Sequence, residues 1–227
     1  MDSKQFVAKL AQDNEELFQA SEMNVEAYFA SEPSQAALVE HFTGRMVNER
    51  MNMVEIANKV ATAPASTTTE DLTLLSKQAL DEANHFRMVK EVIEHITGKK
   101  VDVEAAIAAE AAKPTAKGAD LLAKYEAQKD PLALAAYQFI AEGRAERVWN
   151  KMAECIQDQF ISTTYARIAK DEGFHSNIGR RTLELLAADA ETQARVEQLA
   201  HTMRMDLLDI SRMNTTAGAV KLMDAVY

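Results

Sequence analysis

Two copies of the pattern Asp-Glu-x-x-His could place metal ligands on helices of this chain. They occupy residues 81–85 and 171–175, each within a long stretch of predicted helix. Residues three apart share a helix face, so Glu82 lies beside His85 and Glu172 beside His175. This spacing is typical of four-helix bundles that hold a pair of metal ions. One copy arises readily by chance, and it is the second copy that indicates a site.

Further glutamates fall on the faces that these helices should bury. Stepping three and four residues along each predicted core helix traces an apolar stripe that a few charged residues interrupt. The interrupting glutamates are Glu49, Glu82, Glu142, Glu146 and Glu172. Glu49 and Glu82 lie equally far from the loop predicted over residues 62–69, so they should meet. Glu142 and Glu146 both satisfy this test against Glu172, which leaves the ligand on that helix open, with Glu146 an additional or alternative candidate.

Burying several carboxylates at one level requires compensation. An unpaired carboxylate in an apolar interior destabilises the fold by several kcal/mol or takes up a proton. Four carboxylates and two divalent cations form a neutral centre, which two uncharged imidazoles complete. Oxygen-rich ligation with one imidazole per ion suits iron or manganese better than zinc or copper. The chemistry therefore favours two iron ions and leaves manganese or a mixed manganese and iron pair open.

Composition limits the class of protein. The chain has 227 residues with only 7 Gly and 4 Pro, which favours one all-α domain over residues 1–227. A net charge of −10 argues against binding of nucleic acid or an anionic membrane. The sequence shows no apolar signal core and no run of about 18 apolar residues. The single cysteine, Cys155, excludes an intrachain disulfide and a cysteine zinc site, and we expect a cytoplasmic protein.

Breakers and caps divide the chain into helices. Gly98 should end one of them, and Asp130 with Pro131 should begin another. Residues 98–130 form a long connection, interrupted by Pro114 and Gly118, with one short helix near residues 121–127. The helices are predicted over residues 3–30, 34–61, 70–97, 131–157, 161–186 and 191–211.

With these residues, the stretch of about 34–188 resembles the ferritin-like non-haem di-iron carboxylate superfamily. The resemblance implies a ferritin-like four-helix bundle, a long crossover between its second and third core helices, and additional N- and C-terminal helices. It also implies a ligand set, carried over by motif. These ligands are Glu49, Glu82, His85, Glu142, Glu172 and His175.

The residue before each motif glutamate extends the resemblance. In oxygenases, desaturases and ribonucleotide reductase small subunits of this superfamily, an acidic residue there often hydrogen-bonds the ligand histidine of the opposite motif. Asp81 should therefore hold His175, and Asp171 should hold His85. This feature implies oxygen activation rather than iron storage. Asn84 and Phe174 stand where many of those oxygenases have arginine.

The expected function is that of a dioxygen-activating oxygenase or oxidase acting on a small, largely apolar organic substrate. Electrons would come from a separate reductase or ferredoxin, because the sequence shows no flavin or nicotinamide motif. The alternatives are iron or peroxide handling by a ferritin-, rubrerythrin- or manganese-catalase-like protein, and an interaction bundle without metal. The sequence is compatible with a homodimer.

Apolar residues near the ligands are candidates for a substrate pocket, although ordinary core packing explains such spacing as well. These residues are Phe42, Met46, Met53, Phe86, Phe139, Trp149 and Tyr165. Gly143 and Gly173 each follow a proposed ligand inside a helix, where glycine is unfavourable by roughly 0.5–1 kcal/mol relative to alanine. We expect them to permit a π-type bulge or to leave room for oxygen or substrate, with close packing as the alternative.

Overall fold

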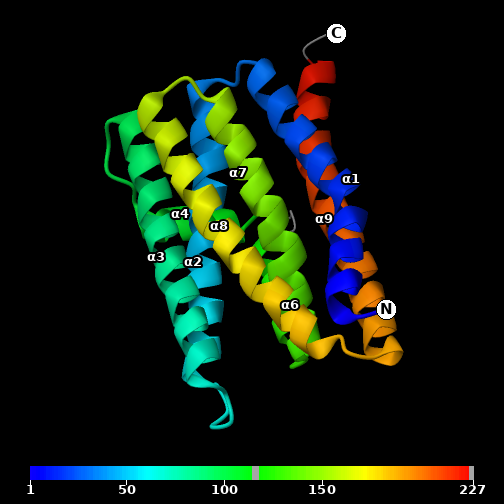
Figure 1. The fold of residues 1–227 in the computed structure, drawn as a ribbon. Helices are drawn as coiled ribbons and strands as arrows, with labels where there is room; N and C mark the ends of the chain where they lie inside the picture. Colours follow the sequence, from blue (N-terminus) through cyan, green and yellow to red (C-terminus); the bar gives the residue numbers. More distant parts are fainter. Residues whose placement is uncertain (114–117, 225–227) are drawn as a thin grey trace.

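The computed structural model describes the backbone of residues 1–113 and 118–224, and the side chains of residues 1–113 and 120–210 (Figure 1). Every regular element in these ranges is a helix, which confirms the all-α prediction. The helices are α1 (Ser3–Ala30), α2 (Gln35–Ala61), α3 (Thr69–Thr97), α4 (Val103–Ala111), α5 (Gly118–Glu126), α6 (Pro131–Tyr137), η1 (Gln138–Glu142), α7 (Gly143–Cys155), α8 (Gln159–Leu186) and α9 (Ala190–Asp224). None of the helices in the described ranges has the length and apolar character needed to cross a bilayer.

Local capping explains where the core helices begin and end. The Ser34 and Thr68 hydroxyls accept hydrogen bonds from the first turns of α2 and α3. Gly98 ends α3 in the left-handed region at φ +66°, which glycine adopts without steric conflict. Asp130 accepts from the backbone N–H of Leu132 ahead of α6. These boundaries agree with those predicted from the sequence.

The connection between α3 and α6 contains two short helices rather than the one predicted. Helix α5 matches the predicted segment, whereas α4 was missed. Residues 103–111 are mostly alanine, so they show little of the apolar periodicity that indicates an amphipathic helix. Both helices pack on α2. Gly118 begins α5 instead of interrupting the connection, and Pro114 lies outside the described residues.

Two helix pairs hold the central part of the molecule. Helices α2 and α3 pack along one another, α7 packs along α8, and α3 contacts α8 (Figure 1). Helix α1 lies against α7, and α9 runs beside α1. The last helix extends well beyond residue 211, where the sequence prediction ended.

The apolar core is divided into two clusters. One cluster contains Phe42 of α2, Val89 of α3 and Tyr165 of α8, while the other contains Ile56 of α2 and Leu183 of α8. On each of these helices the proposed ligands fall in the gap between the clusters. A buried polar layer therefore separates two well-packed apolar regions.

The helix that supplies the third carboxylate contains a wide turn. Residues 131–155 were predicted as part of one helix, and the chain does run through α6 and α7, but η1 between them has π-helical hydrogen bonding. This turn ends at Glu142, directly before Gly143. Helix α8 stays α-helical around Gly173, so the expected bulge occurs next to only one of the two glycines. Short π turns inside α-helices are frequent at functional sites.

Candidate metal centre

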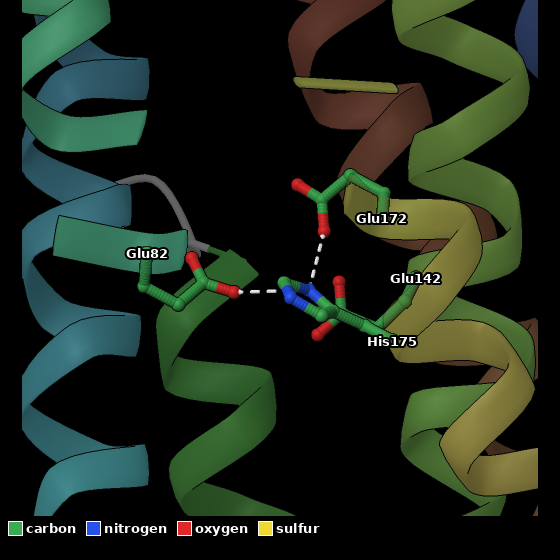
Figure 2. Close-up of side chains that lie close together, drawn as sticks. All are labelled: Glu82, Glu142, Glu172 and His175. Carbon is green, nitrogen blue, oxygen red and sulfur yellow. Dashed lines mark hydrogen bonds and ion pairs between the residues drawn. The ribbon is translucent and has the colours of Figure 1, made fainter. Parts of the chain in front are cut away.

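Four helical segments bring the six proposed ligands together. Glu49 comes from α2, Glu82 and His85 from α3, Glu142 from the end of η1, and Glu172 and His175 from α8; all six are buried. Figure 2 shows Glu82, Glu142, Glu172 and His175 converging from their separate helices on one point. Residues that are up to 126 positions apart in the sequence therefore share one small volume.

The ligand atoms form two groups with one carboxylate in common. Glu82, Glu142, Glu172 and His175 each place one ligand atom within 4.8 Å of the others, and Glu49, His85 and Glu172 do the same. Each group combines a histidine with carboxylates and could hold a metal ion. Because Glu172 belongs to both, the arrangement suits two adjacent ions bridged by a carboxylate.

Both imidazoles face the carboxylates through Nδ1. His175 Nδ1 lies 3.1 Å from Glu172 and 3.4 Å from Glu82, whereas His85 Nδ1 lies 3.8–3.9 Å from the nearest carboxylates. On the outer side, His175 Nε2 lies 3.2 Å from Asp81, and His85 Nε2 lies 3.4 Å from Asp171. The structure thus brings together the crossed pairs expected from the sequence. An outer carboxylate that accepts from Nε2–H leaves Nδ1 free to bind a metal.

Asp81 in turn pairs with a lysine. The Lys77 ammonium forms an ion pair with the Asp81 carboxylate and lies 4.1 Å from the centroid of the Phe174 ring. Phe174 thus supports a cation beside Asp81. The orientation of His175 is therefore fixed by a chain of contacts that reaches the surface through Lys77.

Several ligand atoms are buried without any hydrogen-bond partner among the described residues. They are Oε2 of Glu49, Oε2 of Glu82 and Nδ1 of His85, whereas Oε1 of Glu49 pairs with Arg45 and Oε1 of Glu82 lies 3.4 Å from Nδ1 of His175. Buried polar groups are nearly always satisfied in native proteins, so three unsatisfied ligand-type atoms in one place indicate a missing partner. No side chain of the described residues lies within hydrogen-bond distance of these three atoms. Comparisons with protein-family models, with curated proteins and with solved structures found no match.

The structure separates the two candidate glutamates on the third core helix. Glu142 is buried and belongs to the first ligand group, whereas Glu146 belongs to neither group and is half-buried. The Glu146 carboxylate instead lies over Gly173, where an added Cβ would come within 2.7 Å of its Oε1. Gly173 therefore leaves room for Glu146, which fits the close-packing interpretation.

Arg45 is a component of the site that the sequence analysis missed. Its Nη2 lies 2.5 Å from Glu49 Oε1 and 3.2 Å from Glu172 Oε1, and its guanidinium carbon lies 4.1 Å from the centroid of the Trp149 ring. The available signal was its position four residues before Glu49, which places both residues on one helix face. The structure thus adds a cation in contact with both ligand groups.

Tyr137 was also missed, for a structural reason. Tyr137 is buried at the end of α6, five residues before Glu142, and burial together with the charges of Glu142 and Glu82 raises its pKa. On a regular α-helix, residues five apart point roughly 140° away from each other. In a π turn, residues five apart become neighbours. Only η1 brings Tyr137 to the side of Glu142.

The predicted pocket residues are distributed over the two apolar clusters. Phe42, Met46, Trp149 and Tyr165 belong to the apolar cluster beside Glu49, whereas Phe139 belongs to the other cluster. Met53 and Phe86 are half-buried. Two hollows on the described surface, one beside Asp130 and one beside Gln35, are lined by other residues.

The charged groups of the centre strongly change one another's pKa values. Burial would lower the pKa values of His85 and His175, but the hydrogen bonds that they donate to Asp171 and Asp81, together with the nearby glutamates, raise these pKa values to about 11 and about 10. Burial raises the pKa of Glu49 to about 8, although Arg45 opposes this, and burial with the charge of Glu172 raises that of Glu142 well above its usual range. Without metal, the centre therefore holds several protons at neutral pH.

Metal uptake should consequently release protons and weaken as the pH falls. An ion can bind Nδ1 only after each imidazole has lost a proton, so at least about two protons should leave per pair of ions at pH 7. Calorimetric titration with Mn²⁺ in buffers of different ionisation enthalpy would count them. Tight uptake at pH 7 without proton release would contradict the protonation described above.

Proposed function

We propose that this protein is a dinuclear metal enzyme that activates dioxygen to oxidise a small, largely apolar organic substrate. The observation that carries the proposal is the pair of buried ligand groups that share Glu172 and contain unsatisfied carboxylate and imidazole atoms. Two iron ions suit these oxygen-rich groups best, with manganese or a mixed pair as the alternatives.

Each of the two ligand groups would hold one metal ion. Glu142 and His175 would hold one ion, Glu49 and His85 the other, and Glu172 would bridge them. Glu82 belongs to the first group and lies 3.8 Å from His85, so its second oxygen would be a ligand of the other ion. The four carboxylates balance two divalent charges. This balance would remove the electrostatic penalty of burying the glutamates.

We also propose that the fold is a ferritin-like four-helix bundle. Its core helices would be α2, α3, the continuous path through α6, η1 and α7, and α8, because each of these supplies ligands to one centre. The segment between α3 and α6 would be the long crossover, and α1 and α9 would be the additional helices. The packing of α2 on α3 and of α7 on α8 supports this arrangement.

When bound, the pair of ions supplies the capacity to bind dioxygen and to pass electrons to it. The chain would hold the ions in place. Asp81 and Asp171 keep Nε2 of each imidazole protonated and so keep Nδ1 directed inward. The two apolar clusters exclude water from both ends of the centre, and Glu142 gives up its proton when it becomes a ligand. Electrons would come from a separate reductase or ferredoxin.

Anaerobic loading with Fe²⁺, followed by mixing with oxygen, tests the proposal. We expect about two irons per chain and rapid oxygen uptake in proportion to the iron pairs. His85→Ala and His175→Ala should each lose the paired-iron Mössbauer signature, because each variant removes the only imidazole of one group. The exposed His201 provides a matched control, and His201→Ala should behave like the unmodified protein.

Other outcomes would point elsewhere. Storage of many irons per chain would indicate a ferritin-like role, and rapid oxygen evolution from hydrogen peroxide would indicate a catalase-like role. An intact paired-iron spectrum in either histidine variant would contradict the ligand assignment.

A further inference from the structure

We infer that Arg45 anchors the carboxylate of a small organic acid beside the metal centre, so that the substrate is a monocarboxylate with an apolar body. This inference rests on the proposed function and narrows its substrate class. It starts from the position of Arg45, whose guanidinium contacts both Glu49 and Glu172.

Three hydrogen-bond donors beside Glu49 lack acceptors. Nε of Arg45, Nε1 of Trp149 and the hydroxyl of Tyr165 are buried, and none has a hydrogen-bond partner among the described residues. They come from α2, α7 and α8. The guanidinium stacks on the Trp149 ring, whose centroid lies 5.6 Å from that of Tyr165. Once the Glu49 carboxylate is taken up as a metal ligand, these three donors would favour a ligand rich in acceptors, such as a carboxylate.

Metal binding would leave Arg45 without a full counter-charge. In the metal-free protein, the Arg45 guanidinium contacts Glu49 and Glu172, the same carboxylates that belong to the ligand groups. Once two divalent ions neutralise the four glutamates, the Arg45 charge remains. Asp171 does not cancel it locally, because Asp171 lies at Nε2 of His85 while the glutamates face Nδ1 on the inner side of that ring. An anionic ligand would restore the balance on this face.

The surroundings of Arg45 suit a ligand with an acidic end and an apolar end. The Arg45 side chain is 14% exposed to solvent, so it lies where the buried centre approaches the surface. The Phe42 ring centroid lies 5.5 Å from that of Tyr165, and Met46 packs in the same cluster. Arginine binds a planar carboxylate through two parallel hydrogen bonds, which an amide of the same shape cannot reproduce.

The single tryptophan makes this inference directly testable. Trp149 is the only tryptophan in the chain, so intrinsic fluorescence reports on the site next to Arg45. Protein loaded with Mn²⁺, with its metal content counted, would be titrated with hexanoate and benzoate and with their neutral counterparts hexanamide and benzamide. We expect each acid to change the Trp149 emission and to bind at least about tenfold more tightly than its amide.

Substitutions distinguish binding to Arg45 from binding to the metals. Arg45→Gln should remove the preference for the acid, Arg45→Lys should retain part of it, and Arg50→Gln, an exposed position on the same helix, should leave it unchanged. A preference that persists in Arg45→Gln with two metals bound would place the carboxylate on the ions and overturn the inference.

The comparison of acid with amide in the unmodified protein does not depend on the folding of any variant. Equal affinity for acid and amide in protein that holds two metals would overturn the Arg45 site and leave the metal centre intact. Failure to retain metal would remove the proposed function and this inference with it.

Discussion

Replacing Glu142 with glutamine should stabilise the metal-free protein and abolish binding of the metal pair. Burial and the neighbouring glutamates raise the pKa of Glu142 well above its usual range, so at neutral pH folding must either bury a charge or bind a proton. Glutamine keeps the shape and can donate to Glu172 as the protonated acid does. We expect a gain of about 1–3 kcal/mol in the free energy of unfolding without metal, or roughly 2–10 °C in melting temperature.

When metal is present, the unmodified protein should be more stable than Glu142→Gln. Unmodified protein gains stability from bound ions, by about 2.7 kcal/mol at a hundredfold excess of free metal over its dissociation constant. Glu142→Gln loses a ligand and should gain little. Melting curves with EDTA and with Mn²⁺ would show the crossing.

The pH dependence and a neighbouring variant sharpen this test. A carboxyl whose folded pKa is raised lowers stability only above its unfolded value, so the gain in Glu142→Gln should disappear below about pH 4.5, where Glu142 is protonated in both states. Glu146→Gln, one turn along the same helix, should keep the metals because Glu146 belongs to neither ligand group. Loss of metal in Glu146→Gln with normal metal binding in Glu142→Gln would reverse our assignment.

Much of the site was predictable because its residues follow helical periodicity. The pairs Glu82 with His85 and Glu172 with His175 need only a three-residue spacing on a regular helix. The positions of Glu49 and Glu82 follow from a short loop, whose length sets which turns of two antiparallel helices stand side by side. The structure brings these residues together, as the periodicity predicted.

The parts that were not predictable depend on irregular backbone or on tertiary contacts. The choice between Glu142 and Glu146 needed η1, since residues four apart share a face on any regular α-helix and a wide turn changes which one points inward. Tyr137 was hidden for the same reason. Arg45 was hidden because its second partner, Glu172, lies 127 positions away. No motif in the sequence pairs an arginine at this position with Glu172.

Gly179→Ala should disturb both the fold and the metal centre. A Cβ on Gly179 would clash with the backbone nitrogen of Phe139 and would lie 2.5 Å from the carbonyl oxygen of Ala135. These are backbone atoms of α6 and η1, so α8 must move away from both of them. We expect a loss of about 1–3 kcal/mol or more in the free energy of unfolding, measured by chemical denaturation.

The same shift should lower the metal content, because η1 ends at Glu142 and its displacement moves that carboxylate away from Glu82 and His175. Gly44→Ala supplies the control. Its added Cβ would lie 3.5 Å from the Glu110 carboxylate, an ordinary contact, and alanine favours the helix by about 0.8–1 kcal/mol over glycine. Gly44→Ala should therefore be as stable as the unmodified protein or more so, with two metals bound. If Gly179→Ala matched it in stability and metal content, the close contact between α8 and η1 would not be what positions Glu142.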